Sequence, residues 1–404
     1  MRLRKETKGV LLMSLFIFLP SFIYVTANAP SMAYGVFGVS LIALWTLKFR
    51  ISRFALNRPF FLFLLGTLFL QLIFLIYNNP SLKEIGSLVF LFLLAISAAA
   101  LEFFLRQLEP EKILYHLRKL SLLIVMLGSL SLLHKFQFLG YQKFPKAVFP
   151  FSEPSHFVIS TSAILFFNGF FLKSYGKIIL ILIIVVQALF YPSAIMLFLG
   201  IMMMIFYYVR KPGKFLFFGI IISTIGYLLL TQLGALSYFE DRLNFSEEAS
   251  NITTLVYLQG WEDAYLALIE TNGLGLGFQN MGTLEPGKYG KMIYQILGEY
   301  KNREDAGFLA AKIVGEFGLI GVGFILYYLH LMIRSSVTLF RFMKRRDYSS
   351  NLTIDIFAHS IIITFFLELF LRGYGYFSPG VFLFFVALFL ICNRKIMPNY
   401  ARPE

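Results

Sequence analysis

Residues 177–209 read KIILILIIVVQALFYPSAIMLFLGIMMMIFYYV, and Lys177 is the only charged side chain in this stretch. Apolar runs of this kind are typical of helices that cross about 30 Å of hydrocarbon. The 33 residues are few for two complete spans, and Tyr191 and Pro192 interrupt the run near its middle. The stretch therefore predicts either a tight hairpin at these two residues or one broken helix.

Apolar runs recur along the whole chain, whose 404 residues are 58% hydrophobic and 14% charged. This composition predicts an all-α polytopic membrane protein with about twelve transmembrane helices, built as a single integral membrane domain over 1–404. The runs that we expect to cross the membrane lie at 8–27, 31–47, 59–77, 84–104, 113–133, 155–172, 177–190, 193–209, 214–233, 306–329, 354–372 and 377–392.

Positive charge is distributed unevenly among the connections between these runs. Of the 36 Lys and Arg residues, 25 lie in the two terminal tails and every second connection, 10 lie in the other connections, and Lys312 lies within a span. Because cytoplasmic loops keep positive charge, we expect both termini in the cytoplasm. The net charge of +14 follows from this bias, so it does not indicate a nucleic-acid partner.

The connection at 233–305 is far longer than the others and falls on the outer side of the membrane. A helix that begins after Ser250 or Asn251 would carry an apolar stripe with Gln259 and Asp263 opposite. We weigh three placements for this helix: along the bilayer surface, over a cleft, or with the stripe packed against the bundle. The glycine-rich stretch NGLGLGFQNMG at 272–282 predicts a loop with sharp turns.

The stretch FSEPSHF at 151–157 opens the sixth span from the outer side. Ser152 or Ser155 can cap this helix, Pro154 suits its first turn, and Glu153 complements its dipole. A well-formed helix start explains these residues as well as a function does. His156 is different, because a titratable ring that enters a membrane must face protein or water.

Charged residues also occur within two of the predicted spans. Lys312 and Glu316 are four residues apart in the tenth, and Glu368 and Arg372 are four apart at the outer end of the eleventh. This spacing predicts an ion pair within each helix. Together with arginines of the long loop, of which Arg242 is the strongest candidate, these cations give the outer face groups that bind phosphate.

Three stretches resemble one family: FSEPSHF, SNITTLVYLQGWEDAYLALIETNGLGLGFQNMG at 250–282, and DAGFLAAKIVGEFGLIG at 305–321. They are similar to bacterial O-antigen and exopolysaccharide repeat-unit polymerases, which are related in fold to the O-antigen ligases. The resemblance implies a GT-C-like glycosyltransferase bundle in the inner membrane, with a periplasmic active site and no metal or other cofactor. It also implies undecaprenyl-diphosphate-linked oligosaccharides as donor and acceptor, with a chain-length regulator and a flippase as further partners.

In such a reaction the acceptor hydroxyl loses a proton and the leaving diphosphate needs positive charge. We expect Glu153 or His156 to act as the base, and Arg242 to hold the diphosphate. The candidates for supporting roles in substrate binding are Arg303, Asp305, Lys312, Arg372, Tyr257 and Trp261. Asp305 is the second choice for the base, and Tyr257 and Trp261 suit either sugar stacking or core packing.

Two other functions compete with polymerisation. The ligases use a His in their large loop, and 233–305 contains none, which disfavours a ligase. A transporter or flippase of lipid-linked sugars suits the charges within the spans, although no internal repeat relates the two halves of the chain. The outer loops contain neither a DxD-type acidic pair nor a His cluster, so we expect no obligatory metal.

Overall fold

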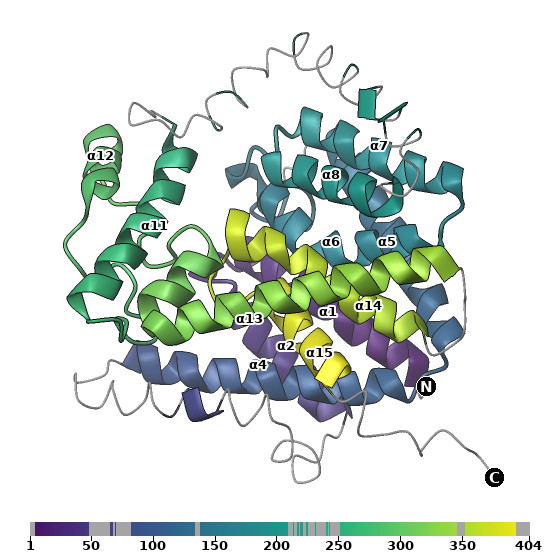
Figure 1. Cartoon of the computed structure of the whole chain (residues 1–404), viewed down its shortest axis with the longest axis horizontal. Helices are drawn as coiled ribbons and strands as arrows, with labels where there is room; N and C mark the ends of the chain where they lie inside the picture. The colour runs from purple at the N-terminus through teal and green to yellow at the C-terminus, as the bar shows by residue number, and fades with distance from the viewer. Residues whose placement is uncertain are drawn as a thin grey trace.

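The computed structural model describes residues 5–47, 65–67, 69, 82–133, 138–208, 251–345 and 352–392, and some single residues between 213 and 242. Over this part the chain is all-α and contains no sheet (Figure 1). The described α-helices are α1 (Lys5–Thr26), α2 (Ala33–Leu47), α4 (Leu82–Arg106), α5 (Pro110–Leu133), α6 (Pro154–Phe171), α7 (Ser174–Phe190), α8 (Ala194–Tyr208), α11 (Ile252–Glu270), α12 (Lys288–Leu297), α13 (Leu309–Arg345), α14 (Leu352–Phe366) and α15 (Pro379–Cys392). A 3-10 turn, η2 (Tyr141–Lys143), and a π-helical turn, η3 (Leu367–Leu371), complete them.

Among the described residues, five helical stretches are long and apolar enough to cross a membrane: Lys8–Thr26, Lys83–Arg106, Pro110–Leu133, Leu309–Lys344 and Leu352–Leu371. The chain is therefore an all-α, multi-pass membrane protein. Helices α2, α7, α8 and α15 are apolar but shorter. Most of the predicted spans at 59–77 and 214–233 lies outside the described residues.

The stretch at 177–209 forms two helices, α7 and α8, that pack against each other. The hairpin is therefore confirmed, and the single broken helix is wrong. Tyr191, the first residue of the turn, fixes its position with two hydrogen bonds. Its hydroxyl donates to the carbonyl of Gly128 at 3.0 Å, and its amide donates to the carbonyl of Gln187 at 2.9 Å. Ser193 then donates its amide to the carbonyl of Ala188.

Helix α6 lies at the centre of the bundle and packs mainly against α14, α8 and α5. Its side chains are buried from Phe157 to Phe170 without interruption, on every side of the helix. A helix that is buried on every side is typical of the centre of a large bundle. Its first turn, which carries Glu153 and His156, is therefore held firmly by the packing below it.

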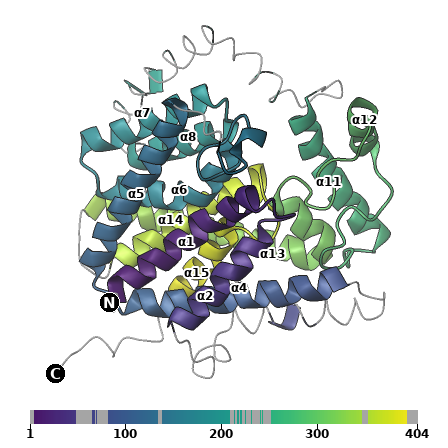
Figure 2. The same cartoon turned by 180° about the vertical axis from the view of Figure 1, so that it is seen from behind.

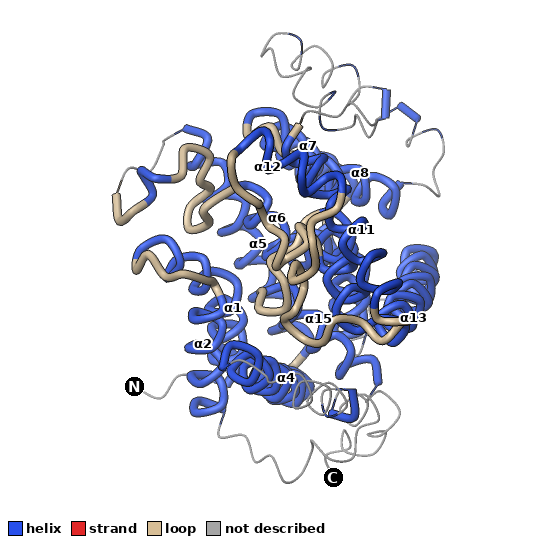
Figure 3. Tube along the Cα trace, turned by 90° about the vertical axis from the view of Figure 1, so that its left-hand side faces the viewer, coloured by secondary structure: helices blue, strands red, loops and turns tan. Residues whose placement is uncertain are grey.

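The helix ends meet in two separate groups. At one end of the bundle, Glu153 contacts Arg372 and Lys83 contacts Glu304. All four residues belong to connections or helix ends that we expect on the outer side. Figure 3 looks onto this end, where the loops gather between α6, α11 and α15.

At the other end, Arg106 donates to the carbonyl of Leu390, and Arg118 donates to the carbonyl of Phe171 at 3.2 Å. All four residues belong to connections or helix ends that the charge count assigns to the cytoplasmic side. In both groups, the described contacts join segments that the sequence places on the same side.

Helix α13 is interrupted at Gly318, whose φ of 58° and ψ of −133° are not helical. The expected span at 306–329 is therefore not one regular helix, although Leu309–Lys344 as a whole is long and apolar enough to cross a membrane. The glycine-rich loop docks on this break: Leu276 donates to the carbonyl of Gly315 and Gly277 to that of Glu316, each at 2.9 Å. The loop thus satisfies backbone groups that the break leaves without helical partners.

The predicted helix of the long loop is confirmed as α11, and Asn251 caps it by accepting from the amide of Thr253 at 2.9 Å. Its orientation differs from the simplest expectation. Gln259 and Asp263 on the predicted polar face are buried, whereas part of the apolar stripe is exposed. Helix α12, which the sequence did not reveal, lies beside α11 at the same side of the bundle (Figures 1 and 2).

Candidate functional site

The start of α6 carries three polar side chains in one hydrogen-bonded row. The Nδ1 atom of His156 lies 2.7 Å from Ser152 Oγ, and its Nε2 atom lies 2.5 Å from Glu153 Oε1. A neutral ring protonated on Nε2 satisfies the whole row, because the Ser152 hydroxyl then donates to Nδ1 and Nε2 donates to the carboxylate. Pro154 occupies the first turn as predicted, but neither serine caps the helix, whose N-cap residue is Glu153.

Arg372 reaches the same carboxylate from the far end of η3, with Nη2 at 3.1 Å from Glu153 Oε1. The predicted pair of Arg372 with Glu368 is therefore wrong. The residues before Arg372 form a π-helical turn, and Arg372 itself is extended, with φ −161° and ψ 126°, so the spacing of an α-helix does not hold. Glu368 instead is buried against Gly380, in the first turn of α15.

The charge of Glu153 is stabilised by its neighbours. Burial alone would raise the pKa of this carboxyl, but the His156 ring and the Arg372 guanidinium outweigh burial and hold the pKa of Glu153 well below its usual range. Its side chain is 36% exposed and that of Arg372 is 28% exposed, so a ligand has access to both. The pair therefore combines an ionised carboxylate with a reachable guanidinium.

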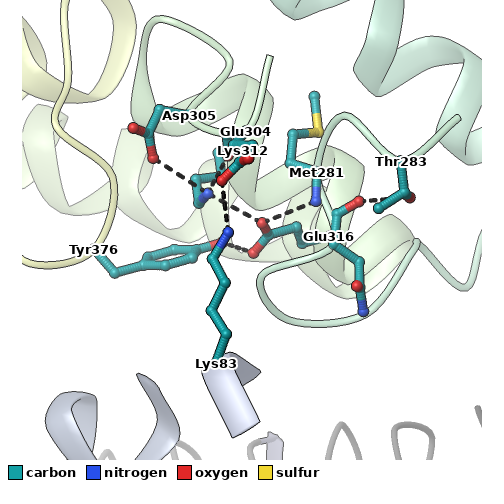
Figure 4. A network of polar contacts seen from close by, with 9 residues as sticks. Lys83, Met281, Thr283, Glu304, Asp305, Lys312, Glu316 and Tyr376 are labelled. Atoms are coloured by element: carbon teal, nitrogen blue, oxygen red, sulfur yellow. Dashed lines mark hydrogen bonds and ion pairs between the residues drawn. The ribbon is translucent and has the colours of Figure 1, made fainter. Parts of the chain in front are cut away.

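A second ion pair lies at the start of α13, as predicted (Figure 4). Lys312 Nζ is 3.2 Å from Glu316 Oε1 and 3.4 Å from Asp305 Oδ1, and it also donates to the carbonyl of Glu304. The side chains of Lys312 and Glu316 are only 2% and 0% exposed. Asp305, by contrast, is open to solvent. The charge of Lys312 is thus already compensated inside the protein.

The carboxylate of Glu316 has two further donors, the hydroxyl of Tyr376 at 2.7 Å and the amide of Met281 at 3.3 Å (Figure 4). Burial, and then the nearby Glu316, raise the pKa of Tyr376 well above its usual value, which keeps this hydroxyl protonated as a donor. Lys83 of α4 forms an ion pair with Glu304, with Lys83 Nζ 2.5 Å from Glu304 Oε2. The hydrogen bond from Lys83 lowers the pKa of Glu304. Neither Tyr376 nor Lys83 was predicted to belong to a site.

The segment 372–376 joins the two ion pairs. The amide of Gly373 donates to the carbonyl of Gly307 at 3.1 Å, and the ring of Tyr374 lies 3.9 Å from that of His156. Tyr374 was also missed by the sequence analysis, although the alternating Gly-Tyr-Gly-Tyr pattern after Arg372 was a visible signal. Within the described part of the chain, the buried hydroxyl of Tyr374 has no hydrogen-bond partner. Such an atom at the edge of a charged cluster is suited to meet a ligand.

Arg303 lies apart from these pairs and fastens the long loop. Its Nε atom is 3.4 Å from Asp263 Oδ2, and its Nη2 atom donates to the carbonyl of Leu284 at 2.7 Å. Burial raises the pKa of Asp263, while the Arg303 guanidinium offsets part of that rise. In these contacts Arg303 connects α11 to the chain that leads into α12.

The other three candidates lie around α11. Tyr257 stacks on Phe308 with ring centroids 4.6 Å apart, and Trp261 lies 5.1 Å from the same ring. Phe308 is fully buried, so both rings pack against the core on one side, while Trp261 remains 36% exposed on the other. The carbonyl of Arg242 accepts from Thr254 Oγ1 at 3.1 Å, which places Arg242 next to the first turn of α11. The contacts described here unite Glu153, His156 and Arg372 at the centre of the site.

Comparison of the chain with protein-family models, with curated proteins and with solved structures found no match. Among the described residues, no group of three or more His, Cys, Asp and Glu side chains is arranged to hold a metal ion. What the site can do must therefore be argued from its own chemistry.

Proposed function

We propose that this protein is an integral membrane glycosyltransferase of about twelve spans and GT-C-like architecture that polymerises lipid-linked oligosaccharide repeat units. It transfers a growing glycan from undecaprenyl diphosphate to the terminal sugar of a second lipid-linked repeat, at the periplasmic face of a bacterial inner membrane with both termini in the cytoplasm. The observation that carries this proposal is the accessible cluster of Arg372, Glu153 and His156 where helix ends meet.

The reaction has two requirements. The acceptor hydroxyl must lose a proton as its oxygen bonds to the anomeric carbon, and the diphosphate must keep the electron pair of the bond that breaks. Glu153 supplies an ionised carboxylate for the proton, and Arg372 supplies a planar guanidinium for the diphosphate. The hydroxyl of Tyr374, which has no partner among the described residues, supports the proposal as a group that binds a sugar or phosphate oxygen beside them.

Arg372 is preferred over Lys312 for the diphosphate because of burial. Lys312 is enclosed and already holds two carboxylates and a carbonyl, whereas Arg372 is partly exposed. Asp305 remains the second choice for the base, since its carboxylate is open to solvent and lies near Gly375 in the connecting segment.

The contact between Arg372 and Glu153 also suggests an order of events. While the guanidinium holds the carboxylate, the pKa of Glu153 is lowered and the group is a weak base. A diphosphate that draws Arg372 away removes one cause of this shift. The base then becomes stronger when the donor is bound, which limits proton abstraction to the occupied site.

Complementation of a bacterial strain that lacks its own polymerase tests the function. With the matching repeat unit present, the wild-type chain should restore a ladder of glycan lengths on a gel. Arg372→Ala should give single-repeat product at equal protein level, and Arg118→Ala, which removes a cation at the opposite end, should give a normal ladder. If the wild-type chain made no polymer, polymerisation would be rejected.

Transport of the lipid-linked sugar is a second candidate, and one observation favours it. Helix α13 is interrupted at Gly318 beside the buried pair of Lys312 and Glu316, and discontinuous helices with buried charges are typical of transporters. Vesicles that contain the purified protein distinguish the two functions. A transporter moves the lipid-linked repeat across the bilayer without lengthening it, whereas a polymerase lengthens it without transport. A ligase remains disfavoured by the absence of His in 233–305.

A further inference from the structure

Helix α11 turns an apolar face outward. Trp261, Tyr265 and Ile269 recur at every fourth residue along it, and Tyr265 and Ile269 are 64% and 55% exposed. A helix of an outer loop that faced water would carry polar side chains on this side. The exposed stripe therefore needs a covering partner.

Two of the three acidic residues of α11, Glu262 and Asp263, have partners within the protein, and the third, Glu270, is exposed at the last residue of the helix. Asp263 is buried against Arg303. Glu262 accepts the amides of Lys288 at 2.8 Å and Tyr289 at 2.9 Å, and so caps the start of α12. An acidic face is the main objection to a lipid-facing placement of this helix. These contacts occupy the carboxylates of Glu262 and Asp263, and Glu270 lies at the very end of the helix.

The stripe continues into the apolar surface of a membrane-spanning helix. After α11 the chain reaches Leu274, which is exposed, and Leu319 donates its amide to the carbonyl of Gly273 at 2.8 Å. Leu319 and Leu326 of α13 are exposed as well. Since the span that contains α13 faces lipid with such side chains, lipid also reaches the end of α11.

The direction of α11 agrees with this placement. In Figure 1 it runs obliquely to α13 at the end of the bundle, rather than parallel to it. A helix that lies in the plane of the bilayer is likewise not parallel to a spanning helix. Trp and Tyr, two of the three residues in the stripe, are also the side chains most enriched at membrane interfaces.

We propose that α11 is an interfacial helix whose Trp261, Tyr265 and Ile269 insert into the leaflet on the side of the bundle that carries Glu153 and Arg372. The partner is the lipid itself, at the boundary between headgroups and acyl chains. This anchor fixes the long loop over the membrane surface, and it does not depend on which reaction the site performs.

The chain has two Trp residues, Trp45 and Trp261, so Trp45→Phe leaves one reporter on α11. Trp45 is 81% exposed, and its replacement removes little packing. The purified Trp45→Phe protein is placed in phosphatidylcholine vesicles whose acyl chains carry bromine either near the headgroup or near the chain end. We expect a loss of Trp261 emission that is larger with the shallow bromines, and weak quenching by iodide in the water phase.

Three results would overturn the proposal. Strong quenching by iodide without quenching by bromine would place the stripe in water. Quenching by neither would mean that protein covers it, including a second copy of this chain. Stronger quenching by deep bromines would place the helix inside the hydrocarbon. Trp261→Phe keeps Trp45, and quenching of its emission by bromine shows that the brominated lipid reaches the protein. Tyr265→Trp, made in a chain that lacks both natural Trp residues, repeats the measurement one helical turn away.

Discussion

Two ion pairs lie at the same end of the bundle, only a short extended segment apart, and they differ in their surroundings. The pair of Lys312 and Glu316 is enclosed by Tyr376, Asp305 and the glycine-rich loop, and every charge in it has a partner. The pair of Glu153 and Arg372 is partly open. In this protein, the enclosed charges of Lys312 and Glu316 therefore stabilise the structure, whereas the partly exposed charges of Glu153 and Arg372 are accessible to a substrate.

The largest loss of stability should come from removing one partner of the enclosed pair of Lys312 and Glu316. Lys312→Met leaves Glu316 as a buried charge without its cation, which should lower the free energy of unfolding by about 3–5 kcal/mol. Denaturant titration of the purified protein in detergent measures this loss. Lys312→Met combined with Glu316→Gln should recover part of it, and wild-type stability of Lys312→Met alone would show that the pair does not hold the fold.

A substitution at Gly318, where α13 is interrupted, should cause the next largest loss of stability. Gly318→Ala places a side chain at positive φ against the backbone of the glycine-rich loop, and we expect a cost of about 1–3 kcal/mol. Gly323→Ala is a matched control in the same helix, since a Cβ there meets no atom within 4 Å. Equal unfolding midpoints for the two variants would contradict the role of Gly318.

The open pair should matter little for stability. Arg372→Ala removes one partner of a partly exposed ion pair, so the free energy of unfolding should change by less than about 1 kcal/mol. The same denaturant titration measures it. A loss as large as that of Lys312→Met would erase the difference between the two pairs.

The smallest effect concerns pH. Because the folded pKa of Glu153 lies below its ordinary value of 4.5, the pair stabilises the fold above that value and loses its contribution only as pH falls through the folded pKa. The difference in thermal midpoint between wild type and Glu153→Gln should therefore stay constant from neutral pH to about pH 5 and shrink only in stronger acid. In Arg372→Ala one cause of the low pKa is gone, so the decline should be smaller and should end at a higher pH. An earlier decline in wild type would be inconsistent with these contacts.

Patterns among residues close together in the sequence predicted features that depend on neighbouring residues, such as helices, turns and pairs within one helix. Apolar runs predicted the helices, the interruption at Tyr191 and Pro192 left a hairpin as one of two alternatives, and the i,i+4 spacing predicted the pair of Lys312 and Glu316. The same spacing failed for Glu368 and Arg372 because a π-helical turn changes the direction of the chain. The true partner of Arg372 lies 219 residues away, where no periodicity can reveal it.

The orientation of α11 was also beyond the sequence, for a physical reason. An amphipathic pattern shows that two faces differ, but not which face meets protein when the surroundings include lipid. Asp263 is buried because Arg303, 40 residues later, returns to it. The tyrosines Tyr374 and Tyr376 were missed because their role depends on contacts made across the bundle with His156 and Glu316.

The most direct test of the open site is the rate of glycan lengthening by purified Arg372→Ala, measured with lipid-linked repeat units in vesicles and expressed per folded protein. Loss of a charge that stabilises the leaving group should lower this rate by about 10²–10³-fold, with the unfolding midpoint nearly unchanged. Arg118→Ala, at the opposite end of the bundle, should retain the wild-type rate. If Arg372→Ala lengthened the glycan as fast as wild type, the cluster of Arg372, Glu153 and His156 would not be the catalytic site.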